Sequence, residues 1–175
     1  KKAQTIAEAY QAMAYDAVAV SGNDLLAGVD FFRQARATGL PFVAANVSDK
    51  EGKLPFSAHR IKHIGPLTLG IIGLTGGTVD KNSDFIVEDW RPALREQITL
   101  LQKECTMLLV LSSLSDDENL QLQKDFQQVD LLVTADKEGR NILPQAVHNS
   151  LRLQSGSQGK YLGSLEITRF GPNEW

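Results

Sequence analysis

The sequence predicts an α/β protein built around a largely parallel sheet. Helix-like and strand-like segments alternate along most of the 175 residues, and the stretches 69–74, 107–112 and 130–134 are predominantly apolar. Strands of that kind are typical of parallel sheets whose two faces are both covered by helices. The length suits one domain with its own hydrophobic core. We therefore expect residues 1–175 to form a single domain.

Four segments have the spacing of amphipathic helices. They cover residues 3–13, 29–39, 90–104 and 116–128. Apolar residues recur in them three or four positions apart, as Leu94, Ile98 and Leu101 do in the third. Gly39 is suited to end the second helix. The aspartates at 116–117 are expected to cap the fourth and to interact with its dipole.

The remaining regular segments have the composition of strands. They are expected at 17–21, 41–47, 59–65, 67–77, 107–113, 129–135, 151–157 and 161–170. The polar stretch 48–53 predicts a turn. Because the last two strands follow one another without a helical segment between them, the C-terminal end predicts a second sheet, mixed or antiparallel.

Composition excludes several classes of protein. The net charge of −3 gives no basic footprint for nucleic acid, and no apolar run approaches the roughly 20 residues of a membrane span. The one cysteine, Cys105, excludes an internal disulfide framework, and we expect it to be a small core residue. The chain begins inside a helical pattern without an initiator methionine, so we expect a processed or truncated start, or further residues upstream.

Polar loops follow three of the predicted buried strands, at the strand ends where α/β proteins concentrate their chemistry. They read "SGNDLLAG", "SSLSDDEN" and "TADKEGR". The strings "YDAVAVSGNDLLAG", "AANV", "LGIIGLT", "LSSLS", "DLLVTADKE" and "GSQGKYLGSLEI" occur in this order. Residues 10–168 thereby resemble the calcineurin-like metallophosphoesterases, and most closely their 5'-nucleotidase branch.

This resemblance implies a particular fold. Two facing mixed β-sheets would be flanked by helices, as an α/β/β/α sandwich. The family's first β-α-β unit, with its motifs "DxHG" and "GDxxxG", would lie before Lys1 and is not shown by this sequence. Loss of that unit would leave unpaired backbone groups on buried edges, so we expect upstream residues or a partner chain to cover them.

The resemblance also identifies the positions of a metal site. In the family, two divalent cations activate a water and bind the phosphoryl oxygens, and aspartate, asparagine and histidine hold them. Asn23 matches the ligand asparagine, but Asp24 follows it in place of the histidine of "GNH" or the acid after that histidine. Ser113 replaces the histidine of "LSHLG", and Asp136 and Glu138 replace the two of "GGHTH". We therefore assign no catalytic residue and interpret these five positions as a vestigial site.

No cofactor is expected at these positions. Oxygen ligands suit hard cations, so a single Mg²⁺ or Ca²⁺ held by Asn23, Asp24, Asp136 and Glu138 is the weaker alternative.

The histidines present elsewhere do not restore the site. His59 and His63 are four residues apart on a predicted outer strand, which would separate them by about 13 Å. We interpret them as solvated polar residues, and His148 as a residue of a surface turn. The glycines at 76–77 are expected to form a turn and not a phosphate cradle, because no Gly-Lys-Ser/Thr follows them.

Two functional hypotheses remain. The first is a catalytically degenerate 5'-nucleotidase-like domain that acts as a non-enzymatic binding or assembly module, through a protein partner or self-association. The alternative is a residual metal-dependent phosphoesterase or nucleotidase whose first metal motifs lie upstream of residue 1. The resemblance also implies a periplasmic or otherwise extracytoplasmic location.

Overall fold

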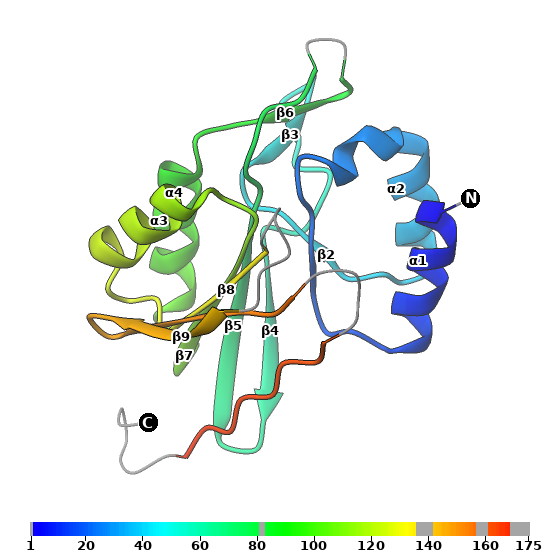
Figure 1. The fold of residues 1–175 in the computed structure, drawn as a ribbon. Helices are drawn as coiled ribbons and strands as arrows, with labels where there is room; N and C mark the ends of the chain where they lie inside the picture. The colour runs from blue at the N-terminus through cyan, green and yellow to red at the C-terminus, as the bar shows by residue number, and fades with distance from the viewer. Residues whose placement is uncertain (1, 81–82, 136–141, 157–160, 169–175) are drawn as a thin grey trace.

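The computed structural model describes residues 2–80, 83–135, 142–156 and 161–168 (Figure 1). Within these residues a six-stranded mixed sheet forms the centre, in the order β4-β5-β7-β8-β10-β9. Its strands are β4 (His59–Ile64), β5 (Leu67–Leu74), β7 (Met107–Ser112), β8 (Leu131–Thr134), β9 (Ile142–Val147) and β10 (Ser150–Gln154). The inner strands β5, β7, β8 and β10 are parallel, and β4 and β9 close the two edges in the antiparallel sense.

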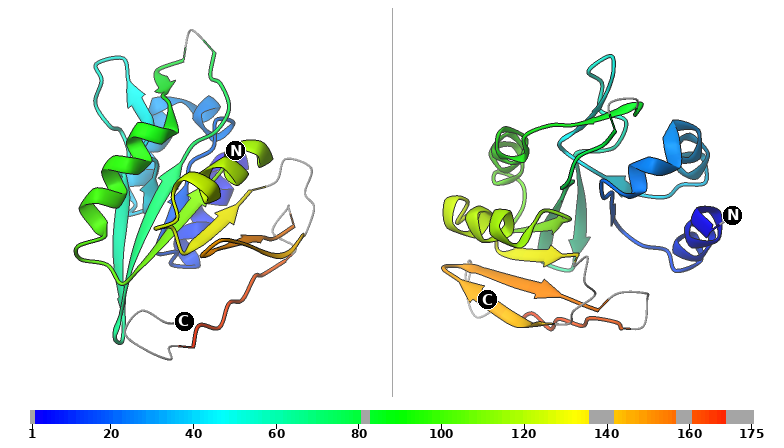
Figure 2. Two further views of the ribbon diagram at one scale, coloured as in Figure 1. Left: turned by 90° about the vertical axis from the view of Figure 1, so that its left-hand side faces the viewer. Right: turned by 45° about the horizontal axis from the view of Figure 1, so that its top comes forward.

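Helices and a second, short β-layer cover the sheet. The helices α3 (Trp90–Leu101) and α4 (Asp116–Asp125) pack on one face. On the other side lie the parallel pair β1 (Val18–Ala19) and β2 (Phe42–Val43), then the 3-10 helix η1 (Asp24–Ala27) with α2 (Gly28–Ala37) and α1 (Lys2–Ala12) (Figures 1 and 2). The pair β3 (Val47–Asp49) and β6 (Phe85–Val87) is antiparallel. The predicted order of layers is confirmed, with β1 and β2 as the second β-layer of the described residues.

The main core lies between the sheet and α3 and α4. Ile72, Val110 and Leu132 stand side by side on three neighbouring strands, and their side chains are 0% exposed. They belong to one cluster with Leu94 of α3 and Leu122 of α4. The apolar faces of the two helices therefore pack on the apolar strands, as the sequence predicts. Cys105 is half-buried against this core, and burial raises the pKa of its thiol.

The opposite face of the sheet is less completely covered. Leu109, Leu111 and Val133 alternate with the core residues of β7 and β8 and are only half-buried. The strand β1 lies on this side, where the N–H of Val18 donates to the carbonyl of Pro41, just before β2, and that of Val20 to the carbonyl of Val43 in β2. The N–H and C=O of Ala19, between them, therefore point away from β2. In the described residues no strand pairs with that edge of β1, although parallel sheets are normally enclosed.

Several predicted boundaries are wrong in the first half of the chain. The stretch 41–47 is not one strand, because β2 ends at Val43 and a new strand, β3, begins at Val47 and runs into the predicted turn. The strand β6 was not predicted, since its apolar run is only three residues long. The cap of α4 is Ser115, which forms a capping box with Glu118. The aspartates at 116–117 lie instead in the first helical turn.

The C-terminal prediction is also wrong. The strand β10 pairs in parallel with β8 and in antiparallel with the unpredicted strand β9, so this end extends the main sheet and does not build a separate one. The physical reason is that β8 would otherwise be an apolar edge strand. The described part of the predicted strand 161–170, residues 161–168, has no regular structure.

The buried side-chain amide of Asn46 links the N-terminal layer to the main sheet. Asn46, 2% exposed, donates from Nδ2 to the carbonyls of Thr75 at 2.8 Å and Glu88 at 3.0 Å. Its Oδ1 accepts the N–H of Thr75 at 2.8 Å, and the Thr75 hydroxyl donates to the Val20 carbonyl at 2.7 Å. The ends of β1 and β5 and the segment before α3 thus share one satisfied polar network. Removing one member would leave buried polar groups without partners.

We expect Asn46→Ala to lower the free energy of unfolding by about 3 kcal/mol, because several buried backbone groups would lose their hydrogen bonds. Urea denaturation followed by circular dichroism measures this change. The exposed turn residue Asn149, changed to alanine, is the matched control. A loss in Asn46→Ala no larger than that of the control would contradict the role of the network.

A second prediction concerns Asp130, whose carboxylate accepts the N–H of Leu108 at 2.8 Å. Burial raises the pKa of Asp130, against the opposing effect of two backbone hydrogen bonds. Because the folded state holds the proton more tightly, this contribution to stability is fully present below the unfolded pKa of about 3.9 and is lost as the pH rises through the folded pKa. Asp130→Asn should therefore be more stable than the native chain at pH 7, with a difference that shrinks toward pH 3.5. Denaturation at both pH values tests this, and a pH-independent difference would contradict it.

Candidate functional site

A crevice of about 430 Å³ lies between β1 and the carboxyl ends of β7 and β8. One wall is formed by β1 and the turn after it, with Tyr10 of α1 and Tyr15. The other wall is formed by Ser112 and Ser113 at the end of β7 and by the end of β8. It is the place where the loops after parallel strands meet, as the sequence predicts for functional residues.

Glycines allow these loops to approach closely. A Cβ on Gly22 would lie 2.8 Å from the Gly76 carbonyl oxygen, and a Cβ on Gly76 would lie 2.3 Å from the Ser113 carbonyl oxygen. Gly77, with φ of +89°, supplies the turn that follows. The predicted glycine turn thus has a second role. Because its residues have no side chains, three polar loops can come into contact there.

The structure brings two of the five predicted positions into this crevice. Asp24 and Ser113 both line it, from opposite walls. Asn23 lines an adjoining cavity of about 260 Å³ between α1 and β1, to which Asp24 also contributes. Asp136 and Glu138 lie outside the described residues.

The polar side chains of the crevice are engaged with the protein itself. The Oδ2 of Asp24 accepts the N–H of Ser21 at 2.8 Å and its hydroxyl at 2.7 Å, which closes the turn before η1. The hydroxyl of Ser113 accepts the N–H of Gly76 at 2.9 Å. Both side chains therefore stabilise the loops on which they stand.

Asp24 and Ser113 alone do not supply the ligands that a pair of transition-metal ions needs. Across the described ranges no group of three or more histidine, cysteine or acidic side chains is placed to hold a metal. His59 Nδ1 lies 2.6 Å from Gln97 Oε1, and His63 Nδ1 lies 3.2 Å from the Thr68 hydroxyl, both on the edge strand β4. His148 is in an exposed turn. A carboxylate and neutral hydroxyls, without imidazole, are a weak ligand set for Zn²⁺, Mn²⁺ or Fe.

Sequence reasoning missed the two tyrosines of the crevice. The rings of Tyr10 and Tyr15 meet edge to face, with centroids 5.1 Å apart. Burial raises the pKa of Tyr10, and the neighbouring Tyr15 and Asp24 act in the same direction, so its hydroxyl remains a protonated donor at neutral pH. Tyr10 lies in the segment predicted as the helix 3–13. The sequence signal that could have indicated this pair was Tyr15, the first residue of the string "YDAV".

Three solved structures have a similar fold. A 5'-nucleotidase precursor from Thermus thermophilus matches 89% of the chain with 20% identity and a TM-score of 0.69. The sulfate thiohydrolase SoxB from the same organism matches 89% with 17% identity and a TM-score of 0.78. The calcineurin-like phosphoesterase YfkN from Bacillus subtilis matches 87% with 15% identity and a TM-score of 0.70.

The similarity lies in the fold more than in the sequence. No protein-family model matches the chain, and no curated protein matches it. The matched part of the chain covers 36%, 30% and 57% of the lengths of these three structures, respectively. The chain therefore has the fold that the calcineurin-like metallophosphoesterases and the 5'-nucleotidases have in common.

Proposed function

We propose that the chain is a catalytically degenerate metallophosphoesterase-fold domain that acts as a non-enzymatic binding or assembly module. One observation carries the proposal. Asp24 and Ser113, at positions where the resemblance puts a metal site, have hydrogen-bonding partners within the loops that line the crevice. Side chains held in this way have a structural role that does not need a metal ion.

The chemistry of the replacements supports the same conclusion. Two-metal hydrolysis needs a set of anionic and imidazole ligands that clamps both the attacking and the leaving oxygen. Asn23 is a neutral amide, and Ser113 offers a neutral hydroxyl. The histidine of "GNH", which would stabilise charge on the leaving group, is absent from that motif. Loss of a single donor of this kind typically lowers the rate by about 10²–10³.

The assembly part of the proposal rests on the open edge of β1. The N–H and C=O of Ala19 point away from β2, and Ala19 lines the crevice together with the apolar residues Leu111 and Val133. Backbone donors and acceptors at a strand edge recognise another strand. The occupant that fits is an extended polypeptide segment of a partner protein, added as a strand beside β1.

The proposed location is outside the cytoplasm. It rests on the resemblance and on the Thermus thermophilus 5'-nucleotidase structure, which is named as a precursor. None of the described helices is long and apolar enough to cross a membrane.

We expect the protein to hydrolyse phosphate esters no faster than background. The test incubates it with Mn²⁺, Zn²⁺, Co²⁺, Mg²⁺ or Ca²⁺ and assays an aryl phosphate, a bis-aryl phosphodiester and nucleoside monophosphates. Metal-dependent turnover that disappears in Asn23→Ala, but persists in the control Asn149→Ala, would establish the residual hydrolase instead.

Strand addition makes a separate prediction. A fluorescent eight-residue peptide of alternating valine and threonine should bind, because it can pair with the open edge of β1. Ala19→Pro removes the outward N–H without removing a bond to β2, and we expect it to weaken binding about tenfold, as loss of a hydrogen bond near 1 kcal/mol and added steric hindrance would do. Ala19→Ser keeps the N–H and is the matched control. Fluorescence anisotropy measures the affinity, and equal binding by both variants would overturn strand addition.

A further inference from the structure

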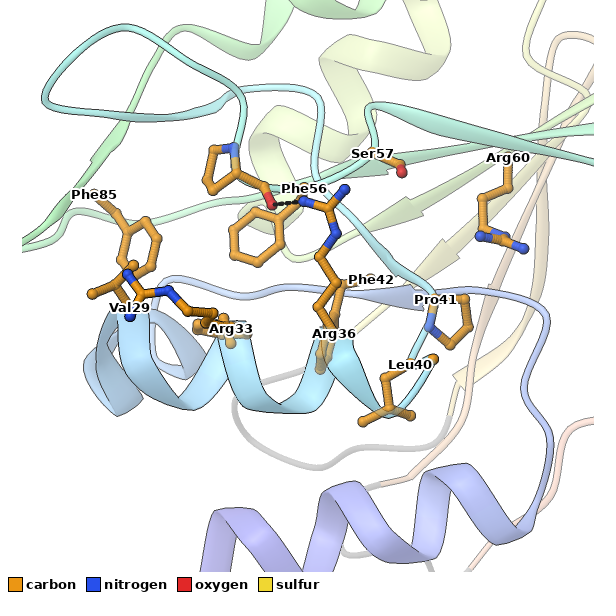
Figure 3. A pocket seen from close by; sticks show the side chains of 13 residues that line it. Val29, Arg33, Arg36, Leu40, Pro41, Phe42, Phe56, Ser57, Arg60 and Phe85 are labelled. Carbon is orange, nitrogen blue, oxygen red and sulfur yellow. Dashed lines mark hydrogen bonds between the residues drawn. The ribbon is translucent and has the colours of Figure 1, made fainter.

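A second pocket of about 450 Å³ lies on the far side of β2 from the crevice, between α2, the segment before β4, and β4 itself (Figure 3). It shares no lining residue with the crevice. The volume is within the range of small-molecule sites, roughly 300–1,000 Å³.

Phenylalanines form the floor of this pocket. Phe32, Phe56 and Phe85 are at most 7% exposed and contact one another, with ring centroids 4.9 to 5.9 Å apart. Phe42 extends the row, with its ring 5.3 Å from that of Phe32. Because these rings pack against one another in a core cluster, they are held rigidly, and the half-buried Phe42 is the ring that stays partly accessible.

Three arginines stand around this floor. Arg33 and Arg36 are three residues apart on α2 and therefore share a helix face, while Arg60 comes from β4 (Figure 3). Among the described residues that line the pocket, none is acidic. The charged side chains that line the pocket are thus all cationic, in a chain whose net charge is −3.

The interactions that these arginines make within the protein are weak. Arg33 pairs with Asp30 at 2.6 Å, but the two side chains are 71% and 80% exposed, and such surface pairs contribute little. Arg36 donates from Nη1 to the Pro55 carbonyl at 3.4 Å, a long hydrogen bond. Arg60 has no side-chain hydrogen bond or ion pair within the described part of the chain. The guanidinium groups are therefore free to reorient toward a ligand.

We propose that this pocket binds a small organic phosphate whose apolar, planar body lies against the phenylalanines while its phosphoryl group is held by Arg36 and Arg60. Guanidinium groups bind phosphoryl oxygens in pairs of parallel, charge-assisted hydrogen bonds. Arg33 lies at the rim, where its charge is offset by Asp30. Ser57, which also lines the pocket, offers a hydroxyl for a further hydrogen bond.

The test uses phenylphosphonate, which has a phenyl ring and a phosphoryl group but no ester bond. Its binding therefore does not depend on whether the protein hydrolyses esters. Titration calorimetry in low salt should show saturable binding, tighter than that of inorganic phosphate or of phenol, and weaker when NaCl is added.

Variants assign that binding to the pocket. Arg36→Gln and Arg60→Gln should each raise the dissociation constant by about 10- to 100-fold, the loss of a charge-assisted hydrogen bond. Arg60→Lys, which keeps the charge but not the paired donors, should lose less. The matched control is Arg95→Gln, because Arg95 lies over Phe126, away from the pocket.

Two results would overturn the proposal. The first is phenylphosphonate binding no tighter than inorganic phosphate, since the phenylalanine floor would then contribute nothing. The second is an affinity of Arg36→Gln and Arg60→Gln equal to that of Arg95→Gln. Thermal unfolding of each variant distinguishes loss of the site from loss of the fold.

Discussion

The contact of the N-terminal layer with the sheet is the constraint on which the rest of the structure depends. β2 crosses β5 so closely that a Cβ on Gly73 would lie 2.2 Å from the Val43 carbonyl oxygen. The N–H of Ala45 donates to the Gly73 carbonyl at 2.8 Å, and Asn46 continues the junction through Thr75. Because β1 is hydrogen-bonded to β2, this junction determines the position of the turn after β1 relative to the ends of β7 and β8.

The groups that build this junction are separate from the groups that face the crevice. Gly73, Asn46 and Thr75 are enclosed and hydrogen-bonded, so changing them disturbs packing and satisfied polar groups. Asp24 and Ser113 border the crevice and make hydrogen bonds only to the neighbouring loop residues Ser21 and Gly76 and to the Leu74 carbonyl. A sequence can therefore lose metal-ligating histidines at such positions while keeping the fold, and the fold by itself does not establish hydrolysis.

Periodicity predicted the main core because it is laid out in long, regular elements: Leu94, Ile98 and Leu101 face the sheet as their spacing requires. It failed where partners are distant in sequence. Nothing local to 41–47 indicates that Asn46 turns the chain toward Glu88, and nothing local to Ser150–Gln154 indicates that it pairs with β8. The order of the motifs predicted that Asp24 and Ser113 lie in one crevice. The pocket lined by Arg36 and Arg60 was not predicted, because these two residues belong to elements with ordinary charge patterns.

The central claim is that this fold persists without the dimetal centre, and Mn²⁺ electron paramagnetic resonance tests it most directly. Mn²⁺ titrated into the protein should keep the six-line spectrum of the free aqueous ion, because the crevice offers a carboxylate already engaged with Ser21 and neutral hydroxyls. Loss of that signal at stoichiometric Mn²⁺, with the appearance of the exchange-coupled spectrum of two neighbouring ions, would contradict the account.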